Sequence, residues 1–366
     1  MAKTYANPTL NNFTPMRILY FSQFFNPHDL RFLKTLVAKG NEVTFLEIGS
    51  HKAAVPKGVR RIEWKGSLKA AISTTKPDVI HAGPLHTNGY LAAKSGFRPL
   101  VMMSWGWDVL WSAQRSELDR RRIVTALRSA DAVITDCAPV SRAVIKLGVT
   151  GSKVVSFPWG VDLMKFRPGK ESNDLRRGLN WQDKFVVLHL RKLEKLYDPE
   201  TAAKAFVRAV KTNPDIRLLM PGAGALENKL RYLFQKKGLS NRVYMPGSVD
   251  QELLPDYYQA ADLYLSCSKS DGSSVSLMEA MACGVPALVS DILGNREWVR
   301  PGKHGWLVDV GNEGEFAKKI LFAASRRKDL VKMGKAARIV AEKKANWDHN
   351  QKSLIRAYQM AQNGTN

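Results

Sequence analysis

The sequence predicts an α/β protein with two parallel, helix-covered sheets, each in a domain of its own. The chain has 366 residues, which is too long for one ordinary core and fits two domains of typical size. Short apolar runs alternate with helix-like segments up to about residue 135, and the same alternation starts again after a stretch rich in Pro and Gly. Such alternation is typical of a parallel sheet with helices on its faces.

The first half opens with a strand, a helix and a second strand. An apolar run at 17–21 is followed by helical spacing at 30–39, and another apolar run follows at 42–46. Further strands are expected at 78–81, 100–103 and 132–135. A linker is expected near 160–182, where four breakers gather: Pro158, Gly160, Pro168 and Gly169.

The second half repeats the pattern. A run at 185–190 predicts its first strand, and a helix is expected to begin near Pro199. Later strands are expected at 216–220, 243–245, 263–265 and 287–289. The stretch from Glu315 to about Gln362 contains no Pro and predicts a mostly helical end. We therefore predict three parts: a domain at 1–165, a domain at 166–345, and a last helix at 346–366 that packs back towards the first domain.

Composition narrows the class of protein. No apolar run approaches the ~20 residues that span a bilayer, and residues 1–16 are too polar for a secretory leader, so we expect a cytoplasmic protein. The three cysteines are odd in number and are not spaced as redox or metal pairs. We expect all three to be reduced and to lie in the core: Cys137, Cys267 and Cys283.

The most informative segment is 270–286, where a turn of small residues leads into a short helix. Gly and Ser allow the backbone to approach a ligand, and the first N–H groups of a helix favour an anion such as a diphosphate. Asp271 in the turn and Glu279 in the helix can reach opposite ends of an elongated, hydroxyl-rich ligand. The alternative is that Asp271 caps the helix and Glu279 pairs on its surface.

This segment resembles the acidic-x7-acidic motif of family-four retaining glycosyltransferases of the GT-B fold, the glycosyl transferases group 1. Asp-Gly-Ser-Ser at 271–274 stands where the family usually has Glu-Gly-Phe-Gly, and 279–286 follows its Glu-Ala-Met-Ala-x-Gly-x-Pro closely. The resemblance implies two Rossmann-like, doubly wound domains that face a central cleft, with the donor in the second. It also implies that Asp271 faces the donor sugar and Glu279 holds the ribose. The remaining contacts to sugar and phosphate are implied for Gly272, Ser273, Ser274 and Val275.

Other segments extend the resemblance along the chain. Residues 157–168 resemble the family's interdomain Pro-Asn-Gly-Val-Asp segment, with Trp159 where Asn is usual. Residues 222–224 and 246–249 resemble the loops that flank the nucleotide base, and 294–305 resembles the stretch after the acidic motif. We therefore expect three more donor-binding residues: Gly222, Gly247 and Val249.

The leaving diphosphate needs cationic stabilisation, because negative charge develops on it in the transition state. Arg191 stands where the family has its phosphate arginine. The family's lysine comes five residues later, where this chain has Leu196, so we expect Lys195 to act, with Lys192 or no lysine as the alternatives. No Asp-x-Asp triplet occurs, and we expect neither a metal nor a cofactor beside the nucleotide sugar.

The first half carries candidates for the acceptor side. His28 and His81 lie near the expected ends of strands, where an open α/β sheet presents its crevice. Trp105 and Asp108 occupy the place of a His-Gly-x-Asp-like segment that faces the sugar in the family, with Trp105 instead of His. We expect these four residues to face the acceptor or the sugar, and a structural role in the core is the alternative for each.

The net charge of +23 is spread over both halves. Residues 1–165 hold 23 Lys and Arg against 11 Asp and Glu, and the remainder hold 33 against 22. An even spread favours attraction to nucleotide sugars or to an anionic membrane surface over a nucleic-acid arm, so no nucleic-acid partner is expected. Trp107, Leu110 and Trp111 near Arg115 could form an apolar edge at the inner face of the membrane, and a core role is the alternative.

The family resemblance implies a hexosyltransferase-type enzyme that retains the donor's anomeric configuration. We expect retaining transfer of a sugar from a UDP- or GDP-sugar to a hydroxyl acceptor, which would be a glycan, a lipid-linked glycan or a small molecule. An epimerase or phosphorylase of the same fold is the main alternative. A basic nucleic-acid-binding protein is a further alternative, although the sequence has no RNP, KH or zinc signature.

Overall fold

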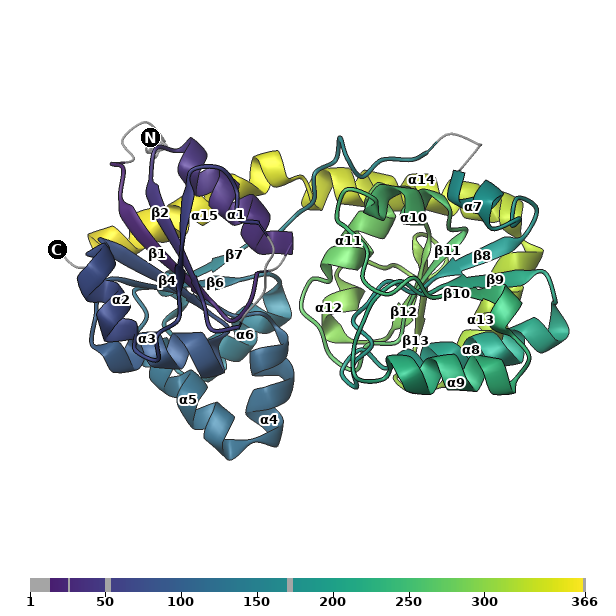
Figure 1. Ribbon diagram of the computed structural model, residues 1–366, viewed down its shortest axis with the longest axis horizontal. Coiled ribbons are helices and arrows are strands. Elements are labelled where there is room, and N and C mark those ends of the chain that lie inside the picture. Colours follow the sequence, from purple (N-terminus) through teal and green to yellow (C-terminus); the bar gives the residue numbers. More distant parts are fainter. Residues whose placement is uncertain (1–13, 26, 50–53, 170–173, 365–366) are drawn as a thin grey trace, which may run out of the picture. The chain divides into compact units, whose positions relative to one another are not determined.

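The computed structural model describes residues 14–25, 27–49, 54–169 and 174–364, and it divides into two units (Figure 1). The first unit contains the described residues up to Thr135, together with Ala143–Ser156 and those from Gln351 on. The second contains Asp136–Arg142 and Phe157–Asn350. Each unit holds one parallel sheet, which confirms the predicted α/β class with two Rossmann-like domains.

The first unit is built on a seven-stranded sheet with the order β3-β2-β1-β4-β5-β6-β7. Its strands are β1 (Arg17–Ser22), β2 (Glu42–Glu47), β3 (Val59–Glu63), β4 (Val79–Gly83), β5 (Leu100–Met103), β6 (Ala132–Thr135) and β7 (Val154–Ser156). Every pairing is parallel, and strands β4, β5 and β6 are buried along their whole length. Full burial on both faces explains why these strands read as continuous apolar runs.

The helices that connect or cover these strands are α1 (Pro27–Ala38), α2 (Leu68–Thr75), α3 (Tyr90–Ser95), α4 (Ala113–Arg115), α5 (Glu117–Arg128), α6 (Ala138–Lys146) and the last helix, α15 (Trp347–Asn363). Two π-type turns, Leu85–Gly89 and Asp108–Ser112, follow β4 and β5, and a 3₁₀ turn, Gly151–Lys153, precedes β7. The side chains of Thr35 on α1 and Gln351 on α15 are hydrogen-bonded at 3.3 Å. Helices α1 and α15 therefore lie side by side.

The second unit has a six-stranded parallel sheet with the order β10-β9-β8-β11-β12-β13. Its strands are β8 (Phe185–Leu188), β9 (Ile216–Leu219), β10 (Val243–Tyr244), β11 (Leu263–Ser266), β12 (Ala287–Ser290) and β13 (Gly305–Val308). Its helices are α7 (Asp174–Gly178), α8 (Pro199–Thr212), α9 (Glu227–Lys236), α10 (Leu254–Gln259), α11 (Val275–Ala282), α12 (Leu293–Arg296), α13 (Glu313–Ser325) and α14 (Arg327–Lys344), with a 3₁₀ turn at Ser240–Arg242.

Alternate residues of β8 face two separate cores in this unit. Phe185 and Val187 pack with apolar side chains of α8, α9, α13 and the first turns of α14, while Val186 and Leu188 pack with those of α10, α11 and the later turns of α14. Figure 1 shows these two groups of helices on opposite faces of the sheet. The period of two along a strand thus fixes which helices each face receives.

Three strands were not expected from the sequence: β3, β7 and β13. Strand β3 lies at the edge of the sheet and is only half-buried. It can therefore carry polar residues, and it lacks the apolar run by which other strands were predicted. Arg61 on β3 instead pairs with Glu47 at 3.1 Å and lies over the Phe45 ring. The three cysteines are buried and free, as predicted. The helical end after Glu315 is also confirmed, as three successive helices.

Candidate functional site

The order of strands in the second unit defines where a ligand can bind. From β8 the chain moves outward to β9 and β10, and then returns to β11, which is the other neighbour of β8. The loops after β8 and β11 therefore leave in opposite directions, and a crevice at the carboxyl ends of the strands is the usual ligand position in such sheets. Arg191 follows β8, and Asp271 follows β11. The fold brings together two predicted residues that are 80 positions apart.

Arg191 lies at the centre of a cluster of polar contacts. Its Nη2 donates to Asp271 Oδ2 at 2.6 Å, and its Nη1 donates to the hydroxyls of Ser274 and Ser276. The side chain of Arg191 is only 9% exposed. Burial is the largest single influence and lowers the pKa of Arg191, but Asp271, Tyr264 and Tyr197 together raise it by more, so the pKa lies above its ordinary value. The guanidinium therefore remains charged.

Two tyrosines support this cluster. The Cζ atom of Arg191 lies 4.2 Å from the centre of the Tyr197 ring, which is a cation–π contact. The hydroxyls of Tyr264 and Ser276 are 2.7 Å apart, so Ser276 links the arginine to β11. Neither tyrosine was predicted, because a single aromatic residue in a strand or loop is usually interpreted as part of the hydrophobic core.

Helix α11 begins beside the guanidinium. Its N-cap is Ser274, whose hydroxyl accepts a hydrogen bond from Leu277 N at 3.4 Å. Asp271 is thus not the cap, and the alternative reading of its role was wrong. Ser273 accepts a hydrogen bond from Trp298 Nε1 at 3.0 Å, which fixes the turn ahead of the helix. The free N–H groups of the first turn and the Arg191 cation form a surface that favours an anion.

Glu279 lies in the second turn of α11 and is buried, with 4% of its surface exposed. Its Oε2 accepts a hydrogen bond from the hydroxyl of Tyr258 on α10 at 2.7 Å. The alternative reading of Glu279 as a surface ion pair was therefore wrong. A buried carboxylate that is held by a specific donor is uncommon in a purely structural helix, because its desolvation is costly.

The predicted glycines allow backbone segments to approach one another. Gly222 has a φ of +136°, and a Cβ there would lie 2.4 Å from the carbonyl oxygen of Arg191. Its N–H donates to Gly247 O at 2.7 Å, and Val249 packs against the core on the α10 and α11 side. Only glycine fits at position 222, because the loops after β8, β9 and β10 approach one another closely there.

In the part of the chain that the structure describes, one of the two candidate lysines, Lys195, lies outside the cluster. Lys195 is exposed, and none of the described residues forms a hydrogen bond or an ion pair with its side chain. Lys192 is next to Arg191, and its pKa is lowered, chiefly by burial. A catalytic role for Lys195 stays a prediction.

In the first unit, two predicted residues contact each other and two are held in the core. His28 and Trp105 pack edge to face with ring centres 5.4 Å apart. His81 is fully buried, its Nδ1 is 2.7 Å from the Tyr358 hydroxyl, and burial lowers its pKa to about 3. Asp108 is fully buried too, and it accepts hydrogen bonds from Ser104 Oγ, Leu85 N and Val109 N. These last bonds organise the loops after β4 and β5.

A residue that the sequence did not single out supports His28. Asp29 is fully buried beside it, with the His28 Nε2 atom 3.3 Å from Asp29 Oδ1. The Tyr20 hydroxyl donates to the same carboxylate at 2.7 Å. Asp29 was not predicted, because a single acid at the start of a helix is usually a solvent-exposed residue of the first turn.

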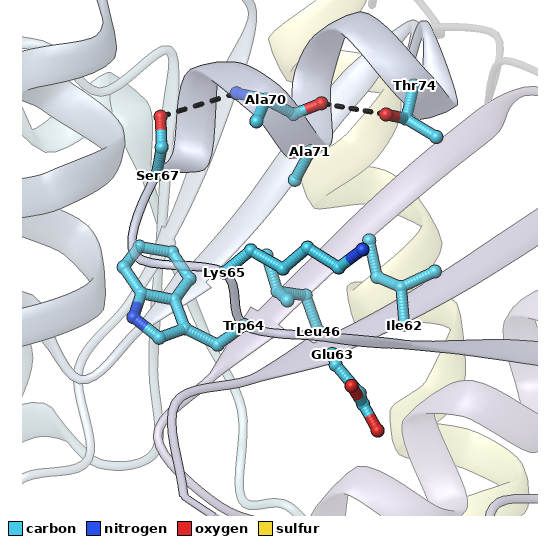
Figure 2. Close-up of a pocket in the computed structure, with 9 residues that line it drawn as sticks. All are labelled: Leu46, Ile62, Glu63, Trp64, Lys65, Ser67, Ala70, Ala71 and Thr74. Atoms are coloured by element: carbon cyan, nitrogen blue, oxygen red, sulfur yellow. Dashed lines mark hydrogen bonds between the residues drawn. The ribbon is translucent and has the colours of Figure 1, made fainter.

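A pocket of about 340 Å³ lies in the first unit between α2 and the ends of β2 and β3 (Figure 2). Leu46, Ile62 and Ala71 form its apolar wall, and the Trp64 and Lys65 side chains lie along it. None of the predicted site residues lines this pocket. It is therefore separate from both groups of candidate residues.

None of the described helices is long and apolar enough to cross a membrane. Within the same residues, no group of three or more His, Cys, Asp or Glu side chains could hold a metal ion.

Comparison with known sequences gave matches over most of the chain. Residues 171–340 match the family Glycosyl transferases group 1, and residues 30–165 match Glycosyltransferase Family 4. The D-inositol 3-phosphate glycosyltransferase of Geodermatophilus obscurus is 27% identical over 242 residues, which are 63% of this chain and 53% of that protein. The same enzyme of Acidothermus cellulolyticus is 26% identical over 256 residues, 66% of this chain and 56% of that protein. The aligned regions span about half the length of these relatives.

Solved structures share the fold. Anabaena HepE in complex with UDP-glucose superposes with a TM-score of 0.81 and 21% identity, covering 94% of this chain and 100% of that one. Sucrose-phosphate synthase from Thermosynechococcus elongatus superposes with a TM-score of 0.77 and 20% identity, covering 94% and 98%. Both similarities show a common fold.

Proposed function

The chain belongs to the Glycosyl transferases group 1 and has the GT-B fold, and on this premise we propose that it transfers a sugar from a nucleoside-diphosphate sugar to a hydroxyl acceptor. The observation that carries the proposal is the Arg191 guanidinium, buried at the switch point of the second sheet beside the start of α11. A permanent cation and free helix N–H groups at one point suit a diphosphate.

We propose that the donor is a UDP-sugar. HepE, which shares the fold, was solved with UDP-glucose, and this supports uridine over guanosine for the present chain. In this arrangement Arg191 and the first turn of α11 bind the diphosphate, Glu279 accepts hydrogen bonds from the ribose, and Asp271 faces the transferred hexose. Gly222, Gly247 and Val249 flank the base.

The reaction we propose retains the configuration at the anomeric carbon. The bond from C1 of the sugar to the phosphate oxygen breaks, and a new bond forms from C1 to the acceptor oxygen on the same face. The acceptor proton moves to the departing phosphate oxygen, so no other base is required. Arg191 stabilises the charge that gathers on the diphosphate, and such a preorganised donor typically contributes a few kcal/mol in the transition state.

The acceptor is proposed to bind at the carboxyl edge of the first sheet. His28 and Trp105 meet there, and the Phe24 ring packs edge to face against Trp105 at 5.3 Å. Aromatic rings and an imidazole suit a ligand with apolar faces and hydroxyl groups, such as a sugar or an inositol ring. His81 and Asp108 then act indirectly, by holding the strands and loops that present these rings.

The charge suggests where the enzyme works. We propose a cytoplasmic protein that binds the inner face of an anionic membrane, with a net charge of +23 as the source of attraction. Arg115 stacks on Trp111 at 3.7 Å, and exposed arginines continue along α5. The even spread of charge over both halves does not favour a nucleic-acid partner.

The test is a turnover assay with a panel of UDP- and GDP-sugars and hydroxyl acceptors, with NMR of the anomeric proton in the product. The expected result is one preferred UDP-sugar and a product with the donor's anomeric configuration. Inversion would contradict the retaining mechanism. Release of an epimerised nucleotide sugar, or phosphate-dependent cleavage of a glycoside, would instead identify the epimerase or the phosphorylase.

A further inference from the structure

A hydrogen bond between α10 and α11 joins Glu279 to Tyr258, a residue that the sequence did not predict. Tyr258 is fully buried, Glu279 is 4% exposed, and the Tyr258 hydroxyl donates to Glu279 Oε2 at 2.7 Å. This distance is the usual one for a hydroxyl–oxygen hydrogen bond, so the bond is well formed. The two residues are 21 positions apart, so only the packing of the two helices brings them together.

The Tyr258 ring is held in place on two sides. Phe166 packs against it edge to face with ring centres 5.9 Å apart, and Tyr264 lies tilted at 6.4 Å. The same residue belongs to the core that joins α10, α11 and α14 to the sheet. A ring locked in this way fixes the position of its hydroxyl, and through it the position of the carboxylate oxygen.

The chemistry of the pair favours an acceptor role for the glutamate. Burial and the nearby carboxylate raise the pKa of Tyr258 well above its ordinary value, so its hydroxyl remains a donor at any working pH. A carboxylate has about four acceptor positions on its two oxygens, and the Tyr258 hydroxyl bonds to Oε2. A side chain anchored through one oxygen has its remaining acceptor directions fixed in space, which suits the recognition of two adjacent hydroxyls.

We propose that Tyr258 is a positioning residue for nucleotide recognition: by holding Oε2 of Glu279 it aims the carboxylate at the 2′- and 3′-hydroxyls of the ribose and makes the enzyme select ribonucleotides over deoxyribonucleotides. The inference rests on the proposed function, in which Glu279 meets the ribose. Tyr258 itself does not touch the ligand.

The test compares the affinities of UDP and 2′-deoxy-UDP by calorimetry for the wild-type chain and for Tyr258→Phe. Wild type is expected to prefer UDP by about 10- to 100-fold, since a hydrogen bond to a charged group is strong. In Tyr258→Phe this preference should fall to about threefold or less. The affinity for 2′-deoxy-UDP should fall less than that for UDP, because this ligand has only the 3′-hydroxyl contact to lose and the diphosphate contacts are kept. An unchanged preference in Tyr258→Phe overturns the proposal.

Tyr358→Phe is the matched control. Tyr358 is also fully buried, and its hydroxyl makes a 2.7 Å hydrogen bond to His81 in the first unit. Its loss should lower thermal stability as much as the loss of the Tyr258 hydroxyl does and leave the preference for UDP unchanged. If both variants reduce the preference equally, general loosening explains the effect and the proposal fails.

Glu279→Gln separates failure of this inference from failure of the proposed function. If Gln at 279 removes the preference for UDP and Tyr258→Phe does not, Glu279 meets the ribose without help from Tyr258. If Glu279→Gln leaves the preference intact, the ribose assignment itself is wrong. Tyr258→Met is the second variant in case Phe at 258 does not fold, since it lacks the hydroxyl and Met adapts to irregular space.

Discussion

The guanidinium of Arg191 lies over the ring of Tyr197, with Cζ 4.2 Å from the ring centre. The same guanidinium donates a hydrogen bond to Asp271, so the ring and the carboxylate both hold it in place. A cation that is held by two neighbours is ordered before any anion binds, which lowers the entropic cost of binding an anion there.

Tyr197→Leu should weaken UDP binding and leave the fold intact. A cation–π contact contributes about 0.5–2 kcal/mol, which corresponds to an affinity loss of about 2- to 30-fold. Tyr197→Phe keeps the ring and should bind UDP almost as wild type does. Calorimetric titration with UDP measures both variants. In an Arg191→Ala background the same Leu substitution should have no effect, and additive losses would show that the ring acts without the arginine.

Arg191→Ala should lower kcat/KM for the donor by about 10²–10³, the usual loss when a preorganised transition-state donor is removed. Steady-state kinetics with thermal unfolding in parallel provides the measurement. The control is Arg176→Ala, because Arg176 is also bonded within the second unit, to Ala260 O and Asp262. That variant should lose stability and keep turnover. A catalytic loss for Arg191→Ala that matches its loss of stability would identify a structural arginine.

Activity should persist in excess EDTA. The chain has no Asp-x-Asp triplet, and the proposed site stabilises the diphosphate with Arg191 and the start of α11. Turnover is measured before and after chelation, with added Mg²⁺ as the comparison. Complete loss in EDTA with recovery on Mg²⁺ would show that a metal ion bridges the diphosphate.

Acidification should destabilise the protein through His81. Burial lowers its native pKa to about 3, against about 6.5 when unfolded. The native state therefore binds fewer protons than the unfolded state, and stability is lost as the pH falls from about 6.5 towards 3. At pH 5 the loss from this residue is about 2 kcal/mol. Urea unfolding at pH 7 and pH 5 measures it, and His81→Phe should show a difference smaller by that amount. Equal differences would mean that His81 is protonated in the native state.

Much of the fold could be predicted because buried parallel strands are apolar along their whole length. Strands β4, β5 and β6 stand out for this reason. Strand β3 was not predicted from its sequence. It is an edge strand without a fully buried residue, and Arg60 and Arg61 interrupt its apolar pattern. Strand β13 begins at Gly305, where a Cβ would lie 1.8 Å from the carbonyl oxygen of Ala287. Glycine is needed for this close pairing, but glycine is uncommon in strands, so the sequence did not predict a strand there.

Some residues of the candidate site could be predicted from the sequence, and others could not. Arg191, Asp271 and Glu279 belong to short motifs and were predicted, and the fold places the first two in contact. Tyr197 and Tyr258 were not predicted, because each acts through a contact that depends on how a loop or a helix packs. A sequence pattern records which residues follow one another and carries no signal for a partner that another helix supplies.

The α5 face offers the most specific test of membrane binding. We define it by Leu118 and Arg121, which are exposed and lie one turn apart on the helix, with exposed Arg120 on the adjoining side and Arg115 on Trp111. Trp107, Leu110 and Trp111 are half-buried, so Leu118, at 58% exposure, is the large apolar group that this face presents most openly. Each cation near an anionic surface contributes about 1 kcal/mol, so two charge reversals should have a large effect.

Arg120→Glu with Arg121→Glu should abolish co-sedimentation with vesicles rich in anionic lipid, because the change removes two attractive charges and adds two repulsive ones. Wild type should bind at low salt and dissociate at high salt, since the attraction is screened. The control reverses a basic run of equal size in the second unit, Arg326→Glu with Arg327→Glu, and should reduce binding only slightly. Equal losses in both variants would show that net charge acts without a defined face. No binding of wild type to strongly anionic vesicles at low salt would remove the membrane proposal and leave a soluble acceptor.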